Sequence, residues 1–278
     1  MDYSIIIRSS GENTTNGLYD FLVKHADDKD CIAIVKGSPF EYTLKKSIEK
    51  AIELNKPKTL FIDADITPAL NFFSMLNYAS RNFPEDALVI EFRALDFLLK
   101  YPACRGLHFY KLEFLKRGLD LIPEYGKELR PETYLKNQIC KFNDCITYRL
   151  NKPIALHDYY QNPYDIFAKS VVRSIRMDVK QQLYLSSESE KNNHGNFYSK
   201  IINSGVEYGL KIGASKINNN RESYREEFDR LFGDEYKKFK PQKQSAFLIN
   251  WTLLRGMYKW SFKELYRFLF HKIRIYKF

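Results

Sequence analysis

The stretch Leu60-Phe61-Ile62-Asp63-Ala64-Asp65-Ile66 decides the fold class, because a short apolar run ends on two acidic residues. Such a run predicts a buried strand. In open α/β sheets, ligands bind at the carboxyl ends of the strands, so both aspartates are expected where chemistry usually takes place. Two carboxylates one residue apart can share a divalent cation, and a diphosphate supplies further oxygen ligands. The stretch therefore predicts a metal and phosphate site at the edge of a sheet.

The sequence around this stretch alternates apolar runs with amphipathic segments, which is typical of an α/β fold. The expected strands are residues 4–7, 31–35, 59–62, 88–92, 106–110 and 154–156. The expected helices are residues 15–25, 39–54 (from a capping box at Ser38-Pro39-Phe40-Glu41, with proline at the first helical position), 131–142, 163–184 and a helix that starts at Thr67-Pro68. Beyond residue 196 the pattern is helical, with no strand expected.

The polar stretch 186–196 divides the chain, since it lacks apolar periodicity. We expect a catalytic domain over residues 1–184 and a helical region over 185–278. The 278 residues suffice for a sizeable core. The N-terminal residues lack the features of a signal peptide, and no apolar run is long enough to span a membrane, so a cytoplasmic location is expected.

The net charge of +10 favours anionic partners. Residues 255–278 contribute much of it, with seven basic residues and one acid among several aromatic side chains. A basic aromatic helix is suited to the surface of an anionic membrane, whereas its charges exclude a span. We therefore expect peripheral attachment to the inner membrane through this tail. Nucleic acid is not an expected partner, because the sequence has no helix-turn-helix, RNP or zinc-finger pattern.

The acidic motif and the strands before it resemble the GT-A glycosyltransferases, in which a Rossmann-like sheet binds a nucleotide sugar and a DxD motif holds its metal. The resemblance covers residues 3–66 well and 86–169 loosely. It implies a GT-A fold with a mixed central sheet flanked by helices and an α-helical C-terminal extension. It also implies that the donor is bound by Arg8, Ser9, Glu12, Lys36, Gly37, Asp63, Ala64 and Asp65.

The same resemblance implies a bound Mn²⁺ or Mg²⁺. Asp65 and Asp63 are the expected ligands, and His157 would complete the set, because many GT-A enzymes use a late histidine. The run Asp158, Gln161, Asp165 and Lys169 is also similar to bacterial surface-polysaccharide transferases. A nucleotide-diphosphate sugar, with UDP-sugar favoured, is therefore the expected donor. The expected acceptor is an oligosaccharide or lipid-linked glycan, as in lipopolysaccharide or capsule synthesis.

An inverting transfer needs a base to deprotonate the acceptor hydroxyl. Glu132, at the start of an expected helix, and Asp96 are the candidate bases. Arg93 and Arg105 are candidates for binding an anionic acceptor. If the enzyme retains configuration, no such base is required.

Three other functions are open at this stage. Asp63-Ala64-Asp65-Ile66-Thr67 also fits the DxDxT motif of haloacid-dehalogenase-like phosphatases, with Asp63 as the nucleophile and Asp65 as the acid/base. That motif normally follows the first strand, whereas two strand–helix units precede it here. A nucleotidyltransferase and a nucleic-acid-binding protein are the remaining alternatives.

Overall fold

The computed structural model describes residues 1–98, 102–176, 195–213, 221–233, 235–236 and 275–277. The chain divides into two compact units, one of Met1–Tyr159 with Gln244–Phe278 and one of Tyr160–Lys243. The expected division into a catalytic domain over residues 1–184 and a helical region over 185–278 stays a prediction.

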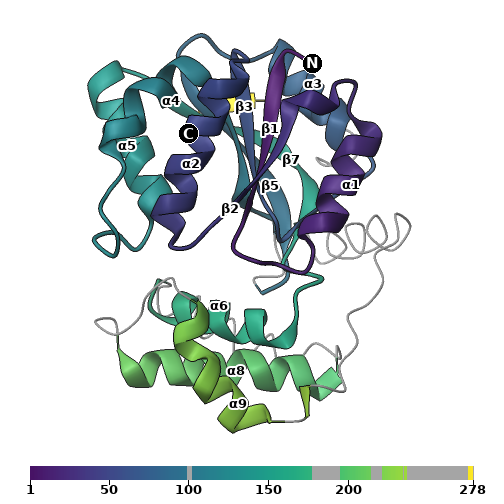
Figure 1. The fold of residues 1–278 in the computed structure, drawn as a ribbon, viewed down its shortest axis with the longest axis vertical. Coiled ribbons are helices and arrows are strands. Elements are labelled where there is room, and N and C mark those ends of the chain that lie inside the picture. Colours follow the sequence, from purple (N-terminus) through teal and green to yellow (C-terminus); the bar gives the residue numbers. More distant parts are fainter. Residues whose placement is uncertain (99–101, 177–194, 214–220, 234, 237–274, 278) are drawn as a thin grey trace. The chain divides into compact units, whose positions relative to one another are not determined.

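The first unit is built on a mixed sheet, shown in Figure 1. Its strands are β1 (Tyr3–Ser9), β2 (Ile32–Lys36), β3 (Lys58–Asp63), β4 (Ile66–Pro68), β5 (Ala87–Asp96), β6 (Pro102–Lys111), β7 (Ile146–His157) and β8 (Ile275–Lys277). The strand order is β2-β1-β3-β6-β5-β7-β4, and β8 also pairs with β7. β1 is parallel to β2 and β3, β5 is parallel to β7, and β6 is antiparallel to both of its neighbours.

Helices cover both faces of this sheet (Figure 1). On one face lie α1 (Thr15–His25) and α3 (Phe72–Arg81), and on the other lie α2 (Phe40–Leu54), α4 (Leu112–Gly118) and α5 (Pro131–Asn143). Two short 3₁₀ helices, Lys29–Cys31 and Leu119–Leu121, complete the unit's described helical segments. The expected mixed α/β sheet flanked by helices is thereby confirmed.

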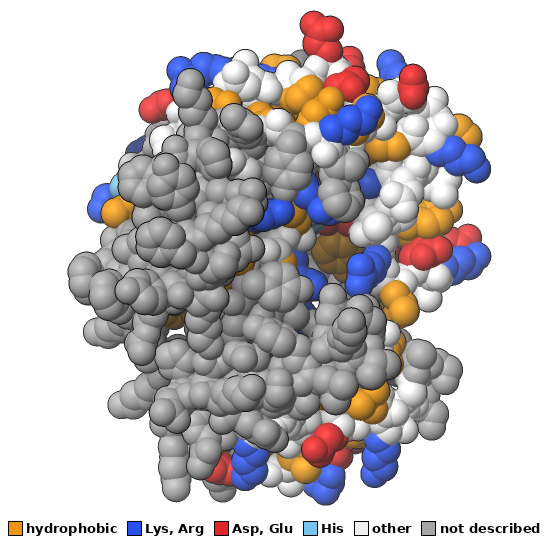
Figure 2. Space-filling model, turned by 180° about the vertical axis from the view of Figure 1, so that it is seen from behind, with side chains coloured by type: hydrophobic (Ala, Val, Ile, Leu, Met, Phe, Trp, Pro, Cys, Tyr) orange, Lys and Arg blue, Asp and Glu red, His pale blue; other side chains and the backbone are white. Residues whose placement is uncertain are grey.

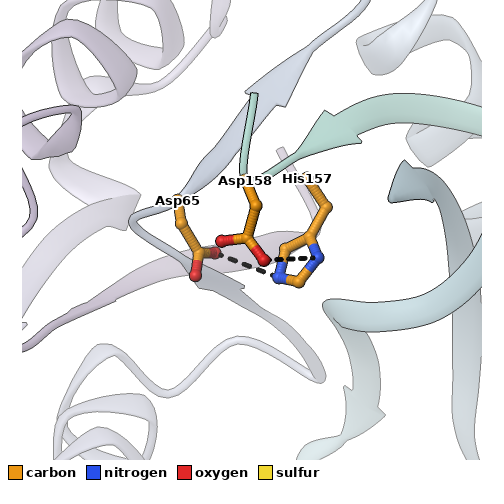
Figure 3. A group of neighbouring side chains, drawn as sticks. All are labelled: Asp65, His157 and Asp158. Atoms are coloured by element: carbon orange, nitrogen blue, oxygen red, sulfur yellow. Dashed lines mark ion pairs between the residues drawn. The ribbon is translucent and has the colours of Figure 1, made fainter. Parts of the chain in front are cut away.

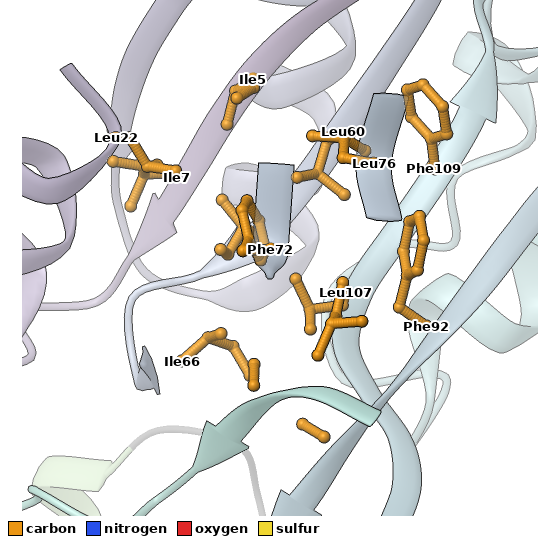
Figure 4. Packing of buried hydrophobic residues seen from close by; sticks show 14 of the residues in the cluster. Ile5, Ile7, Leu22, Leu60, Ile66, Phe72, Leu76, Phe92, Leu107 and Phe109 are labelled. Carbon is orange, nitrogen blue, oxygen red and sulfur yellow. The ribbon is translucent and has the colours of Figure 1, made fainter. Parts of the chain in front are cut away.

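The side chains of each strand divide between two hydrophobic cores, because successive residues point to opposite faces. Ile5 and Ile7 join the core under α1 and α3, where Phe72 and Phe109 also pack (Figure 4). Ile6, between them on β1, joins the core under α2, α4 and α5. Burial on both faces explains why the central strands appear in the sequence as continuous apolar runs.

The connections place the topological switch point of the sheet at the carboxyl ends of β1 and β3. The chain leaves β1 through α1 to reach β2, and it then returns through α2 to β3 on the other side of β1. The strand order therefore reverses at β1, which is where open α/β sheets bind ligands. Ser9 and Asp63 end the two strands at this point.

Two expected helix starts differ from the structure. The helix expected at Thr67-Pro68 is wrong, because these residues form β4 and the helix starts only at Phe72. Pairing with β7 outweighs the local helix-start signal, and proline is acceptable on an edge strand. The capping box is wrong as well, because Pro39 occupies the N-cap of α2 and no side chain caps the helix.

The expectation of no strand beyond residue 196 is also wrong. Ile275–Lys277 forms β8, whose Ile275 lies opposite Leu150 in antiparallel pairing with β7. Three residues are too few to show a strand period in the sequence, and the edge of β7 provides the pairing. The rest of the tail over 255–278 lies outside the described residues.

In the second unit, α6 (Pro163–Arg176) packs against α8 (Gly195–Ile212). The 3₁₀ helix Arg221–Tyr224 leads into α9 (Arg225–Phe232). Gly205 and Gly209 permit the close approach of α8 to α6, since a Cβ at Gly209 would lie 2.6 Å from the carbonyl oxygen of Val171. The absence of a side chain at Gly209 is therefore a packing requirement.

We expect Gly209→Ala to destabilise the protein, because the added methyl group would force the two helices apart. Overpacking of this kind costs about 1–3 kcal/mol, partly offset by the higher helix propensity of alanine. The measurement is the urea unfolding midpoint. Leu210→Ala, at the neighbouring exposed position of the same helix, is the matched control and should change the midpoint little. An unchanged midpoint for Gly209→Ala would contradict the packing requirement.

Candidate functional site

Three buried side chains meet at the carboxyl end of β3. Asp65 lies between β3 and β4, His157 ends β7, and Asp158 follows it (Figure 3). One ligand atom from each residue lies within 4.8 Å of the other two. Nε2 of His157 is 3.5 Å from Oδ1 of Asp65, and Nδ1 is 3.4 Å from Oδ2 of Asp158. The structure thus brings together two of the residues predicted as metal ligands, Asp65 and His157.

Backbone pairing builds this group. Ile66 on β4 lies opposite His157 on β7, and the backbone N–H of Asp158 donates to the carbonyl oxygen of Asp65 over 3.1 Å. Asp158 has a φ of +66°, a left-handed conformation in which non-glycine residues are uncommon. The sequence interpretation did not assign Asp158 as a ligand. Its position directly after His157 was the available signal.

Asp96 supports the group from β5. Its Oδ2 lies 2.8 Å from Nδ1 of His157, and its Oδ1 accepts the backbone N–H of Leu98 over 2.9 Å. Nε of Arg105, on β6, lies 3.5 Å from the same Oδ2. Asp96 is fully buried. The structure therefore brings two further predicted residues, Asp96 and Arg105, to the edge of the group.

The electrostatics of the group suit a divalent cation. Burial alone would lower the pKa of His157, but the carboxylates of Asp158 and Asp65 outweigh it and raise the pKa to about 10. Asp65, Asp96 and Asp158 together carry more negative charge than Arg105 and a protonated His157 neutralise. With a neutral imidazole and a bound divalent cation, the formal charges of the five residues and the ion would sum to zero. The donor set and its charge therefore fit such an ion.

Arg8 holds Asp63 next to this group. Its Nη2 and Nε lie 2.7 and 2.8 Å from Oδ1 of Asp63, and its Nη1 lies 2.9 Å from Oε1 of Glu132. Its guanidinium also packs over the rings of Phe40 and Phe61, at 5.2 and 5.4 Å from their centroids. The structure thus directs the carboxylate of Asp63 to Arg8. The described group that could hold a cation contains Asp65 but not Asp63.

Gly106 on β6 leaves room for the carboxylate of Asp63. A Cβ at Gly106 would lie 3.0 Å from Oδ2 of Asp63, and the φ of +63° favours glycine. The pairing of β5 with β6 also shifts register between Glu91 and Arg93, opposite this position. The regular pairing of β5 with β6 is therefore interrupted beside Asp63, one of the predicted donor-binding residues.

Glu132, in the first turn of α5, is engaged by three side chains. Its Oε1 accepts the hydroxyl of Tyr110 over 2.8 Å and lies 2.9 Å from Nδ1 of His108 and from Nη1 of Arg8. Burial raises the pKa of Glu132, but Arg8 and His108 outweigh it and hold the pKa well below its usual range. A carboxylate with a lowered pKa is a weak proton acceptor. These contacts favour a structural role over that of the predicted base.

The predicted donor-binding loops meet at the carboxyl ends of β1, β2 and β3. The N–H of Gly37 donates to the carbonyl oxygen of Ser9 over 3.0 Å, and the N–H of Ala64 donates to that of Arg8 over 2.9 Å. Oε2 of Glu12 accepts the hydroxyl of Ser9 over 3.0 Å, which closes the turn after β1. The predicted residues are therefore close in space, and their donor-binding role stays a prediction.

Lys36 and Arg93 are the remaining predicted residues. Lys36 ends β2 and is exposed. Arg93 lies on β5 opposite Cys104 and is partly buried. Neither belongs to the Asp65–His157–Asp158 group. Their roles in donor and acceptor binding stay predictions.

No known protein family and no curated protein matches the sequence. The similar solved structures include the mannosyltransferase PcManGT from Pyrobaculum calidifontis in complex with GDP-Man and Mn²⁺ (10% identity, TM-score 0.38, covering 98% of this chain and 88% of that one). A glycosyltransferase involved in glycosylation of the major capsid of PBCV-1 is similar at 15% identity and a TM-score of 0.34, covering 50% and 75%. A197 from STIV is similar at 17% identity and 0.37, covering 54% and 81%. At such low similarity these likenesses carry no argument about function, which rests on the site residues.

We expect Glu132→Gln to destabilise the fold by about 3 kcal/mol at pH 7, because it removes one carboxylate from a buried cation. The lowered pKa of Glu132 means that its stabilisation is complete above the unfolded value of about 4.3 and is lost as the pH falls through the folded value. The stability difference between wild type and variant should therefore shrink below about pH 4.

Urea unfolding from pH 7 to pH 3 measures this difference. Glu124→Gln, an exposed glutamate paired with Lys127, is the control and should follow the wild-type profile closely. A Glu132→Gln variant with wild-type stability at pH 7 would contradict the role assigned to this carboxylate.

Proposed function

We propose that the protein is a metal-dependent glycosyltransferase that moves a sugar from a nucleotide-diphosphate donor to a glycan acceptor. The observation that carries the proposal is the buried Asp65–His157–Asp158 group beside the switch point at the carboxyl ends of β1 and β3. A cation site next to a nucleotide-binding crevice is what transfer from a diphosphate requires.

Asp65, His157 and Asp158 would hold Mn²⁺ or Mg²⁺. Carboxylates suit both ions, whereas an imidazole ligand favours Mn²⁺. The ion would neutralise the negative charge that develops on the departing diphosphate. Asp65 and Asp158 supply oxygen ligands from two separate segments of the chain, so the site forms only when β4 and β7 are paired.

The nucleoside would be bound by the loops after β1 and β2. Ser9 and Glu12 close one loop, and Lys36 and Gly37 form the other. Asp63 presents a carboxylate that is 27% exposed and fixed by Arg8, which suits it to accept a hydrogen bond from a ribose hydroxyl. Because Arg8 already fixes the Asp63 side chain, this carboxylate is expected to bind a ribose hydroxyl with little loss of side-chain entropy.

The phosphatase alternative assigns Asp63 as a nucleophile. Arg8 contacts Oδ1 of the Asp63 carboxylate through two nitrogen atoms, and this ion pair lowers the nucleophilicity of that oxygen. A transferase does not depend on the nucleophilicity of Asp63, so this contact favours the transferase. The candidate bases of an inverting reaction, Asp96 and Glu132, are also engaged by neighbouring side chains, and the proposal does not depend on them.

We further propose a bacterial surface glycan, oligosaccharide or lipid-linked, as the acceptor, with Arg93 and Arg105 near it. Attachment to an anionic membrane through residues 255–278 would bring the enzyme to a lipid-linked acceptor. Among the described helices, none is long and apolar enough to cross a membrane.

The described surface carries charges of both signs. On the face in Figure 2, Lys and Arg side chains lie beside Asp and Glu side chains.

We expect a nucleotide diphosphate with Mn²⁺ to stabilise the wild-type protein in a thermal-shift panel of UDP, GDP, CDP and ADP. A ligand at a hundredfold excess over its dissociation constant adds about 2.7 kcal/mol to the native state. Asp65→Ala and Asp158→Ala should lose the Mn²⁺-dependent part. The exposed Asp86→Ala is the matched control and should keep it. Phosphatase activity without nucleotide binding would overturn the proposal in favour of the alternative.

The membrane proposal is tested by charge reversal, because deletion of the tail would also remove β8 from the sheet. Each cation contributes about 1 kcal/mol near anionic lipid, so replacing three cations by glutamate should reduce binding by at least about a hundredfold. The variant is Lys259→Glu, Lys263→Glu and Arg267→Glu, and vesicle sedimentation is the measurement. The control reverses three exposed lysines, Lys45, Lys116 and Lys127. Equal loss of binding in both variants would contradict a specific role for the tail.

A further inference from the structure

We infer that Asp96 is a positioning residue, which fixes the orientation and tautomer of His157 and thereby sets the affinity of the Asp65–His157–Asp158 group for a divalent cation. The inference rests on the proposed function and replaces the role of a base for this residue. It is carried by three observations: the contact between the two side chains, the backbone that enforces it, and the partners that occupy Asp96.

The contact determines which imidazole nitrogen is available. Oδ2 of Asp96 lies 2.8 Å from Nδ1 of His157, within hydrogen-bond distance, whereas Oδ2 of Asp158 lies 3.4 Å from the same nitrogen, so a proton at Nδ1 is donated to Asp96. The other nitrogen, Nε2, is the one that faces Asp65, at 3.5 Å from its Oδ1. A metal-binding histidine usually donates its second ring N–H to a carboxylate, which fixes the ring and increases its basicity.

The backbone leaves this contact little freedom. Asp96 and His157 are register partners in the parallel pairing of β5 with β7. The N–H of Phe97 donates to the carbonyl oxygen of His157 over 2.9 Å, and the N–H of Leu98 donates to Oδ1 of Asp96 over 2.9 Å. Both strands would have to separate for Asp96 to leave the imidazole.

The surroundings of Asp96 exclude it from contact with the acceptor. The residue is fully buried, and each of its carboxylate oxygens has a partner within the protein. Arg105 lies 3.5 Å from Oδ2 and offsets its charge. An engaged and buried carboxylate cannot reach an acceptor hydroxyl, but it can orient the ring of His157.

The test measures Mn²⁺ binding by the full-length, metal-free protein, from the electron paramagnetic resonance signal of free Mn²⁺. Asp96→Asn keeps the shape and an acceptor oxygen but removes the charge, and it should weaken binding 10- to 100-fold. Asp96→Ala, which removes both, should weaken it further. Glu91→Gln is the matched control: it alters a buried carboxylate of the same strand that pairs with Lys136 and Arg149, and it should leave the affinity for Mn²⁺ unchanged.

A second readout concerns the imidazole itself. The Nδ1–H proton of His157 should give a downfield, slowly exchanging NMR signal in wild type and in Glu91→Gln, and the signal should be lost in Asp96→Ala. A merely structural role for Asp96 would not move the signal of this one proton in a folded variant.

The outcomes are distinguishable. Failure of the wild-type protein to bind Mn²⁺ would overturn the proposed metal site and this inference with it. Binding by wild type that is equally strong in Asp96→Asn and Asp96→Ala would overturn the inference alone. Equal weakening in Glu91→Gln would also overturn it, because the effect would then be a general loss of stability.

Discussion

The pairing of the carboxyl end of β7 with β5 on one side and β4 on the other is the constraint on which the candidate site depends. His157 lies opposite Asp96 in one pair and opposite Ile66 in the other. Asp65, Asp96 and Asp158, which come from three separate segments of the chain, thereby contact the imidazole of His157. Because hydrogen bonds of the sheet fix these positions, the side chains are arranged before any ligand binds, which is the condition for strong electrostatic effects in a site.

A second set of charges lies under α2 and α5, on one face of the sheet. There Arg8 joins Asp63 to Glu132, and Glu91 lies between Lys136 and Arg149. Burying charges costs free energy that the pairing only partly recovers, so an apolar core would serve stability as well or better. Arg8 instead fixes the carboxylate of Asp63 at the carboxyl end of β3, beside the proposed donor site, whereas Glu91 contacts Lys136 and Arg149.

Much of the fold and part of the site could be predicted from the sequence. Strong apolar runs and the motif Asp63-Ala64-Asp65 identified the central strands, and Asp65 and His157 do meet. Asp158 was not assigned as a ligand, because its place beside His157 depends on a left-handed φ of +66° after β7, which the sequence does not show. The partner of Asp63 was also missed, since contact with Arg8 depends on β1–β3 register. β4 and β8 are three-residue strands that exist through tertiary pairing alone.

Gly106 has a consequence for how this protein can vary. A Cβ there would lie only 3.0 Å from Oδ2 of Asp63, so the carboxylate would have to shift, and the positive φ is one that other residues rarely adopt. Variation at this position is thus limited by the space beside Asp63 and by the backbone conformation, although glycine has no functional group to contribute. In a library of random substitutions selected for function, position 106 should lose variants as strongly as position 63, whose carboxylate it accommodates. A search for functional side chains alone would overlook this glycine.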